Sequence, residues 1–158
     1  MAHREGIRAY LKNVQVHGLV HDWGCGTKPI KNYLKPNTAE FVGIDKLEHV
    51  GADIIADIEK LMNAGKKADF AFCLEVLEHV WNSGQVIKNI HINLKDGGYL
   101  YLSQPFFYEV HKEDDRVRYT WHGLKQLLEE ASFSVEEIWP TVGSLDKAEG
   151  YIVRAYKS

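Results

Sequence analysis

The segment His21-Asp22-Trp23-Gly24-Cys25-Gly26-Thr27 decides the fold that this sequence predicts. It continues a run that begins at Leu19 and is typical of a buried strand, and two glycines follow that run directly. Glycine allows a tight turn and a close approach between the backbone and a ligand. The segment therefore predicts a strand that ends in a ligand-binding loop, although a glycine pair also fits an ordinary structural turn.

Strands and helices alternate on both sides of this loop. Apolar spacing, glycines and prolines predict strands at residues 19–23, 41–44, 52–56, 69–74, 99–103, 134–139 and 151–156. They predict helices or helical turns at residues 4–14, 29–34, 58–64, 75–94 and 120–131, with Thr120 as a cap and a turn at 95–98. The last two strands have no helix between them and should pair antiparallel at one edge.

This alternation predicts an α/β fold with a Rossmann-like, doubly wound sheet of seven strands. The sheet should be mostly parallel, with an antiparallel last strand and helices on both faces. We expect residues 1–158 to form a single domain. In such sheets ligands bind at the carboxyl ends of the strands.

Composition narrows the classes of partner. The net charge is −3 and the charged residues are interspersed, so nucleic acid is not an expected partner. The polar first residues lack the apolar core of a signal peptide, and no stretch approaches the roughly 20 apolar residues of a membrane span. With two cysteines, Cys25 and Cys73, expected to be free thiols, the sequence predicts a cytoplasmic protein.

Two histidines have the spacing of metal ligands but not the context. His17 and His21 are four residues apart, as are paired ligands on a helix. Gly18 and the strand that follows place them off any helix. We therefore expect no metal site from them.

Acidic residues follow the next two strands. Asp45 comes after the second strand and Asp57 after the third. A carboxylate about 20 residues beyond a glycine loop can accept hydrogen bonds from ribose hydroxyls. Either residue alone fits a strand-end turn, but together with the loop they predict an adenosine site.

Two segments carry a family resemblance. Residues 22–28 resemble the first motif of class I S-adenosylmethionine-dependent methyltransferases, with Lys28 where the family often has a third glycine. Residues 71–80 closely resemble the fourth-strand segment of the subgroup related to ubiquinone and menaquinone methyltransferases. The resemblance implies S-adenosylmethionine as cofactor, S-adenosylhomocysteine as product, and a cofactor site made of Asp22, Trp23, Gly24, Cys25, Gly26, Lys28, Asp45, Lys46, Asp57, Ile58, Leu74 and Glu75.

The resemblance also implies roles within that site. Asp45 would hold the ribose, and Asp57 with the backbone of Ile58 would bind the adenine edge. Leu74 and Glu75 would line the methionine part, and Lys28 could meet its carboxylate. An electronegative cleft suits the sulfonium cation.

The helix expected after Glu75 opens with two further polar residues. Glu78 and His79 would occupy its first turn, where they either face the site or are simply solvated.

Residues 105–120 resemble the same subgroup and predict the acceptor site. Its candidate residues are Phe106, Phe107, Tyr108, His111 and Arg118. For a hydroxyl acceptor, His111 is the first candidate for general base, because an imidazole titrates near 6.5; a surface histidine without a role fits equally well. Arg118 would bind an anionic acceptor or pair with an acid of the loop, namely Glu113, Asp114 or Asp115.

The sequence thus predicts a methyltransferase acting on a small-molecule, sugar or lipid-linked acceptor. The chain is short for this family, so the acceptor pocket is expected to be open or completed in a homodimer. One alternative is an NAD(P)-dependent oxidoreductase, because Tyr108 and Lys112 have the Tyr-x-x-x-Lys spacing, although the last glycine of the dinucleotide fingerprint is missing. The other is a non-catalytic relative that only binds the cofactor.

Overall fold

A seven-stranded sheet runs through the part of the chain that this computed structural model describes, residues 2–27 and 29–158. Its strands are β1 (Leu19–Trp23), β2 (Glu40–Asp45), β3 (Ile54–Ile55), β4 (Ala68–Leu74), β5 (Leu94–Pro105), β6 (Phe133–Pro140) and β7 (Gly150–Lys157). The order is β3-β2-β1-β4-β5-β7-β6. β1 to β5 pair in parallel, and β7 is antiparallel to β5 and β6. The predicted Rossmann-like fold and its antiparallel edge are confirmed.

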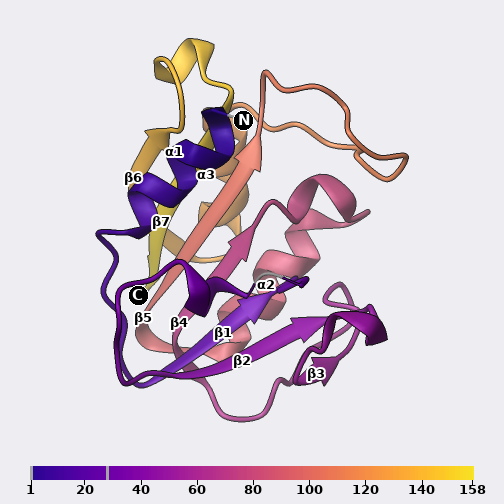
Figure 1. Ribbon diagram of the computed structural model, residues 1–158, viewed down its shortest axis with the longest axis vertical. Helices are drawn as coiled ribbons and strands as arrows, with labels where there is room; N and C mark the ends of the chain where they lie inside the picture. The colour runs from indigo at the N-terminus through magenta and orange to yellow at the C-terminus, as the bar shows by residue number, and fades with distance from the viewer. Residues whose placement is uncertain (1, 28) are drawn as a thin grey trace.

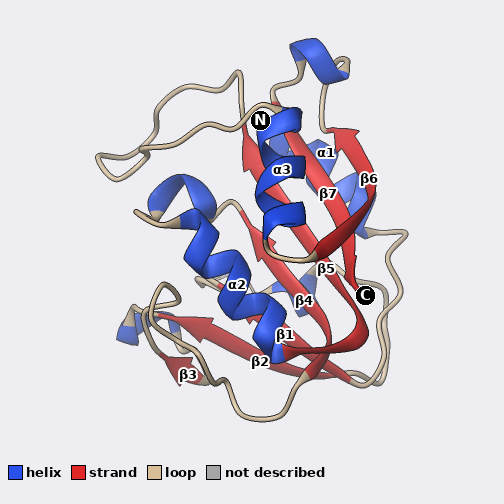
Figure 2. Cartoon of the chain, turned by 180° about the vertical axis from the view of Figure 1, so that it is seen from behind, coloured by secondary structure: helices blue, strands red, loops and turns tan. Residues whose placement is uncertain are grey.

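Helices cover both faces of the sheet (Figures 1 and 2). They are α1 (Ala2–Leu11), α2 (Ser83–Asn93) and α3 (Trp121–Glu130), with short 3₁₀ turns η1 (Ile30–Asn32), η2 (Glu48–Val50), η3 (Leu77–His79) and η4 (Leu145–Lys147). Phe72 of β4 packs with α1 on one face, and the adjacent Cys73 faces the core under α2 and α3. Among the helices that the structure describes, none is long and apolar enough to cross a membrane.

The start of α2 corrects the sequence prediction. The sequence predicts a helix from residue 75, but Glu75 has a left-handed backbone, with φ of 57°, and only η3 follows it. The helix begins at Ser83, where the side chain of Asn82 accepts a hydrogen bond from the backbone N–H of Gln85.

For α3 the predicted cap is confirmed, because the Thr120 hydroxyl accepts a hydrogen bond from Gly123 N at 3.1 Å.

Two other predicted helices or helical turns are shorter than predicted. Residues 58–64 contain only a turn at 58–60. Asparagine side chains of α2 bind the backbone of this segment: Asn89 Nδ2 donates to the Ile58 carbonyl at 2.9 Å, and Asn93 Oδ1 accepts from Ala64 N at 2.8 Å. Residues 29–34 contain only η1. The first N–H of η1, that of Ile30, donates a hydrogen bond to the carboxylate of Asp22 in β1.

Two strand boundaries also differ. The turn predicted at 95–98 is an irregularity inside β5, where Gly97 has φ of 75° and the pairing register with β4 shifts. β3 contains only Ile54 and Ile55, instead of residues 52–56, yet it still pairs in parallel with the end of β2. The carboxyl ends of the parallel strands therefore lie where the sequence predicts them.

Candidate active site

A cleft of about 290 Å³ lies at the carboxyl ends of β1 to β4. It brings together most of the predicted cofactor residues. Those that line it are Gly24, Gly26, Asp45, Lys46, Asp57, Ile58 and Glu75. Residues outside the predicted cofactor set also line it, namely Leu47, Ala56, Glu59, Val76, His79, Val80, Lys112 and Asp114.

The glycine loop is fixed to the end of β2. Gly24 N and Cys25 N both donate to the Ile44 carbonyl, at 2.8 and 3.1 Å. Gly24 has φ of 76°, and a Cβ there would lie 2.5 Å from a methyl group of Val76. Gly26 has φ of 53°, and a Cβ there would meet no atom within 4 Å, so its backbone faces open space. The left-handed backbone favours glycine at both positions, and at Gly24 a larger residue would also collide with Val76.

Asp45 joins this loop to the second strand. Its Oδ2 accepts from Gly26 N and its Oδ1 from Leu47 N, both at 3.0 Å. A carboxylate has about four acceptor positions, so two remain for a ligand. Asp57 has one oxygen bound to Glu59 N at 3.0 Å, and its side chain is 40 % exposed. Both acids can therefore accept further hydrogen bonds from the cleft.

A second cleft of about 220 Å³ shares Gly24 and Glu75 with the first and extends beneath α1. Asp22, Cys25 and Leu74, three more of the predicted cofactor residues, line it. The Asp22 carboxylate accepts from Ile30 N at 2.7 Å; burial raises its pKa to about 6, and the charge of Asp45 adds to this rise.

One residue predicted for the cofactor does not line either cleft, and another is not described. The side chain of Trp23 is completely buried in the core under α2 and α3, so it is the backbone of this residue that borders the loop. Lys28 lies outside the described residues.

Glu75 occupies the junction of the two clefts. Its Oε1 accepts from the Ser103 hydroxyl at 2.9 Å, and its Oε2 lies 2.9 Å from His3 Nε2. The other ring nitrogen of His3, Nδ1, is 2.6 Å from the Thr141 hydroxyl oxygen. The strained backbone of Glu75 is thus held by contacts from α1 and β5.

Sequence reasoning missed the contribution of α1 to the site. His3 is completely buried, and Arg4 and Arg8 line the second cleft. A signal existed, because His3 precedes the buried Ile7 and Leu11 by four and eight residues and so shares their helix face.

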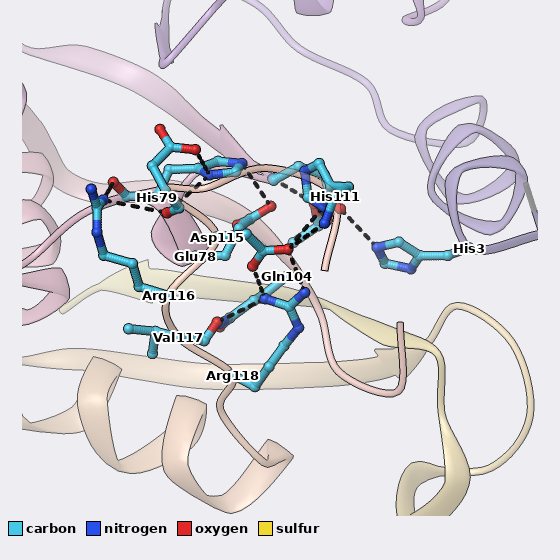
Figure 3. A network of polar contacts seen from close by, with 12 residues as sticks. His3, Glu78, His79, Gln104, His111, Asp115, Arg116, Val117 and Arg118 are labelled. Atoms are coloured by element: carbon cyan, nitrogen blue, oxygen red, sulfur yellow. Dashed lines mark hydrogen bonds and ion pairs between the residues drawn. The ribbon is translucent and has the colours of Figure 1, made fainter. Parts of the chain in front are cut away.

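The loop between β5 and α3 is organised by Asp115 (Figure 3). Its side chain is fully buried and bound by both terminal nitrogens of Arg118, which holds the pKa of Asp115 at about 2. The Asp115 Oδ2 also lies 2.9 Å from His111 Nδ1. Of the two roles considered for Arg118, the structure shows pairing with an acid of the loop, and that acid in turn fixes one nitrogen of the candidate base His111.

Two residues of η3 face this loop rather than solvent. Glu78 is completely buried, and among the described residues neither of its carboxylate oxygens has a hydrogen-bond partner. Burial and the nearby Glu75 raise its pKa. His79 Nδ1 lies 3.0 Å from Asp114 Oδ1, so these two residues do not form the solvated first turn that the sequence also allows.

The predicted aromatic residues lie beside the clefts rather than in their walls. The ring centroid of Phe106 is 4.6 Å from that of Phe107, which is 63 % exposed. The ring of Tyr108 is 5.6 Å from that of His3. Tyr108 and Lys112 both lie in the loop after β5, not on a helix as the oxidoreductase alternative requires.

Comparison with known proteins identifies relatives of this fold. No curated protein sequence matches the chain. The cyclase SpnF has a TM-score of 0.77 and 15 % identity, over 98 % of this chain and 80 % of SpnF. An S-adenosylmethionine-dependent methyltransferase from Mesorhizobium loti has a TM-score of 0.74 and 18 % identity, over 99 % and 98 % of the two chains. The 1,6-didemethyltoxoflavin-N1-methyltransferase of Burkholderia thailandensis, with bound S-adenosylhomocysteine, has a TM-score of 0.72 and 19 % identity, over 99 % and 78 %.

At these identities the solved structures establish the fold alone, and SpnF shows that this fold also carries a cyclase. A sequence-family match goes further. The family described as a methyltransferase domain matches residues 6–138, which include the glycine loop, both acidic strand ends and the loop after β5. The chain belongs to this methyltransferase domain family, within the class I S-adenosylmethionine-dependent methyltransferases.

Proposed function

We propose that this chain binds S-adenosylmethionine across the two clefts and methylates a small-molecule acceptor beside His111. The observation that carries the proposal is the hydrogen bond from Gly26 N to the Asp45 carboxylate, at 3.0 Å. It unites the glycine loop and the second strand end in the same cleft as Ile58.

The first cleft suits an adenosine. The free acceptor positions of Asp45 can take the two ribose hydroxyls, since its other positions are already bound by backbone N–H groups. Ile58 offers an apolar surface to an adenine ring, and Asp57 offers an acceptor to its amino group. These residues therefore fit the parts of a nucleoside without rearrangement of the loop.

The second cleft suits an amino acid. Glu75 and Asp22 line it from the sheet, and Arg4 and Arg8 line it from α1. An α-amino group can face the acids while a carboxylate faces the guanidinium groups. The methionine part of the cofactor thus has partners of both signs.

Charge favours a sulfonium over a pyrophosphate. The first cleft is lined by two lysines but five acids, namely Asp45, Asp57, Glu59, Glu75 and Asp114. A dinucleotide fold places its pyrophosphate at the start of a long helix, whereas the described segment after this loop contains only the three-residue η1. These features disfavour the oxidoreductase alternative.

The protein's part in methyl transfer is alignment and proton removal. When bound, S-adenosylmethionine supplies an electrophilic methyl group. The residues of the loop after β5 hold the acceptor in line with it. His111 would take the proton of an acceptor hydroxyl on the nitrogen that Asp115 does not hold. Small metabolites, sugars and lipid-linked precursors all fit this chemistry, and the 71–80 segment favours the ubiquinone-related subgroup.

Calorimetric titration with S-adenosylhomocysteine tests the cofactor site. Asp45→Ala should weaken binding roughly 100-fold, because two charged hydrogen bonds are lost. Asp96→Ala is the matched control, since the Asp96 side chain is 87 % exposed and its ion pair with Lys157 lies outside the residues that line the two clefts. The affinity of this variant should equal that of the unmodified protein. Tight NADH binding without S-adenosylhomocysteine binding would overturn the proposal. Formation of S-adenosylhomocysteine from S-adenosylmethionine with fractionated acceptor pools then tests turnover.

A further inference from the structure

Three potential metal ligands converge where η3 meets the loop after β5. Glu78, His79 and His111 each offer one ligand atom, and these three atoms lie within 4.8 Å of one another. His79 Nε2 is 3.6 Å from Glu78 Oε1, too far for a hydrogen bond but suited to two ligands of one ion. From this geometry we propose that Glu78, His79 and His111 bind a divalent transition-metal ion.

The histidine rings are held as metal-binding histidines usually are. His79 Nδ1 lies 3.0 Å from an Asp114 oxygen, and His111 Nδ1 lies 2.9 Å from an Asp115 oxygen. An Nδ1–H that donates to a carboxylate leaves the Nε2 lone pair free and fixes the orientation of the ring. In both carboxylate–histidine pairs, the tautomer with its proton on Nδ1 leaves Nε2 available to a metal ion.

Glu78 supplies the independent observation. Its side chain is completely buried, and among the described residues neither carboxylate oxygen accepts a hydrogen bond. Buried polar groups in folded proteins almost always have a partner, so an orphaned carboxylate requires an explanation. A metal ion bound to it would be that partner.

The charge around the cluster is also unbalanced. Asp114 and Asp115 face the two histidines, and Arg118 is bound to Asp115. The neighbouring Arg116 donates instead to backbone carbonyls, those of His79 and Asp114. A divalent cation would offset the remaining negative charge.

Ligand chemistry defines the class of ion. Two imidazoles and one carboxylate suit Zn²⁺, Mn²⁺, Co²⁺ or Fe²⁺ better than Ca²⁺ or Mg²⁺, which prefer oxygen ligands. Three protein ligands leave coordination positions open. His79 and Asp114 also line the first cleft, so the ion would lie beside the cofactor, and an open position would be free for an oxygen atom of the acceptor.

This last role rests on the proposed function, and it replaces one of its steps. With a metal bound, His111 is a ligand and no longer a general base. The ion would then lower the pKa of the acceptor hydroxyl that it binds, and the released proton would go to solvent.

Metal binding is tested on the full chain after treatment with EDTA and removal of the chelator. Titration with Mn²⁺, Zn²⁺ and Co²⁺ should show one ion per chain for at least one of them, and bound Co²⁺ should give a visible spectrum of nitrogen and oxygen coordination. His111→Asn should weaken binding at least 100-fold, and Asp115→Asn about 10- to 100-fold. His17→Asn is the matched control, because His17 is exposed at the opposite, amino end of β1.

The outcomes distinguish a failure of the proposed metal site from a failure of the proposed cofactor site. Affinity for S-adenosylhomocysteine is measured on the same metal-free protein. No stoichiometric binding of any of the three ions, or equal binding by His111→Asn and His17→Asn, would overturn the metal site even where S-adenosylhomocysteine binds. Stoichiometric metal binding that His111→Asn abolishes supports the site, even where S-adenosylhomocysteine does not bind. His111 lies on a loop with its side chain 23 % exposed, so this variant tests the site with little risk to the fold.

Discussion

His3 Nε2 lies 2.9 Å from Glu75 Oε2, which ties the first helix of the chain to the end of β4. The same ring contacts the Thr141 hydroxyl oxygen at 2.6 Å. A single buried imidazole thus joins α1, the end of β4 and the residue that follows β6. Because Glu75 lines both clefts, this contact links the packing of α1 to the shape of the site.

Removing this ring should destabilise the fold and weaken cofactor binding. His3→Ala leaves Glu75 and Thr141 without their buried partner, which should lower the free energy of unfolding by about 2 kcal/mol. Affinity for S-adenosylhomocysteine should fall with it, because Glu75 is no longer held. Urea unfolding and calorimetry measure the two effects, with the exposed His17→Ala as control. Stability equal to that of the control would contradict the structural role of His3.

The glycine loop allows a matched pair of substitutions. Gly24 and Gly51 have φ of 76° and 75°, so alanine at either position should cost about 1–2 kcal/mol in backbone conformation. A Cβ at Gly24 also lies 2.5 Å from a Val76 methyl group, whereas a Cβ at Gly51 meets nothing within 4 Å. Gly24→Ala should therefore lose a further 1–3 kcal/mol, roughly, from overpacking. Chemical denaturation compares the free energies of unfolding of the two variants. Adding Val76→Ala should restore part of the stability that Gly24→Ala loses. Equal losses of stability at both glycines would contradict the predicted collision with Val76.

Much of the sheet was predictable because its signals are local. Trp23 and Leu74 end short, largely apolar runs that are typical of a buried strand, and both strands lie within a residue of their predicted ends. The start of α2 was not predictable. It depends on Glu75, whose N–H is bound by the Ser103 carbonyl and whose side chain is bound by His3, both distant in the sequence.

The same division applies to the site. Asp45 and Gly26 were expected together because parallel strands end at one edge, and the structure joins them directly. The pairing of Arg118 with Asp115, three residues apart, is one of the two roles that the sequence allowed. The burial of Glu78 instead arises where the loop after β5 folds back over η3 and Arg116 N donates to the Glu78 carbonyl. No local pattern specifies that contact, so the sequence allowed Glu78 to be a solvated residue of a first helical turn.

Stability should depend on pH through Asp22. Its pKa rises from 3.8 to about 6 on folding, mainly because it is buried. A raised pKa means that the folded chain binds this proton more tightly, so the contribution to stability is full below pH 3.8 and is lost as pH rises through 6. The difference is about 3 kcal/mol. Asp22→Asn still accepts from Ile30 N but cannot ionise, so its stability should lack this decrease. Urea unfolding between pH 4 and 7 measures both curves, and parallel curves would rule out the titration of Asp22.

The pairing of Arg118 with Asp115 should hold the loop after β5 in place. Arg118→Ala leaves the fully buried Asp115 carboxylate with only His111 beside it, which should cost up to about 3 kcal/mol. Backbone hydrogen exchange over residues 106–120 should rise, because the loop loses its central contact, while exchange in β1 to β4 stays unchanged. Arg118→Lys should give an intermediate effect, since an ammonium cannot bind both carboxylate oxygens in the same geometry. Lys125→Ala, on the exposed face of α3, is the control. Unchanged exchange in the loop of Arg118→Ala would show that other contacts fix it, and the acceptor site would then not depend on this ion pair.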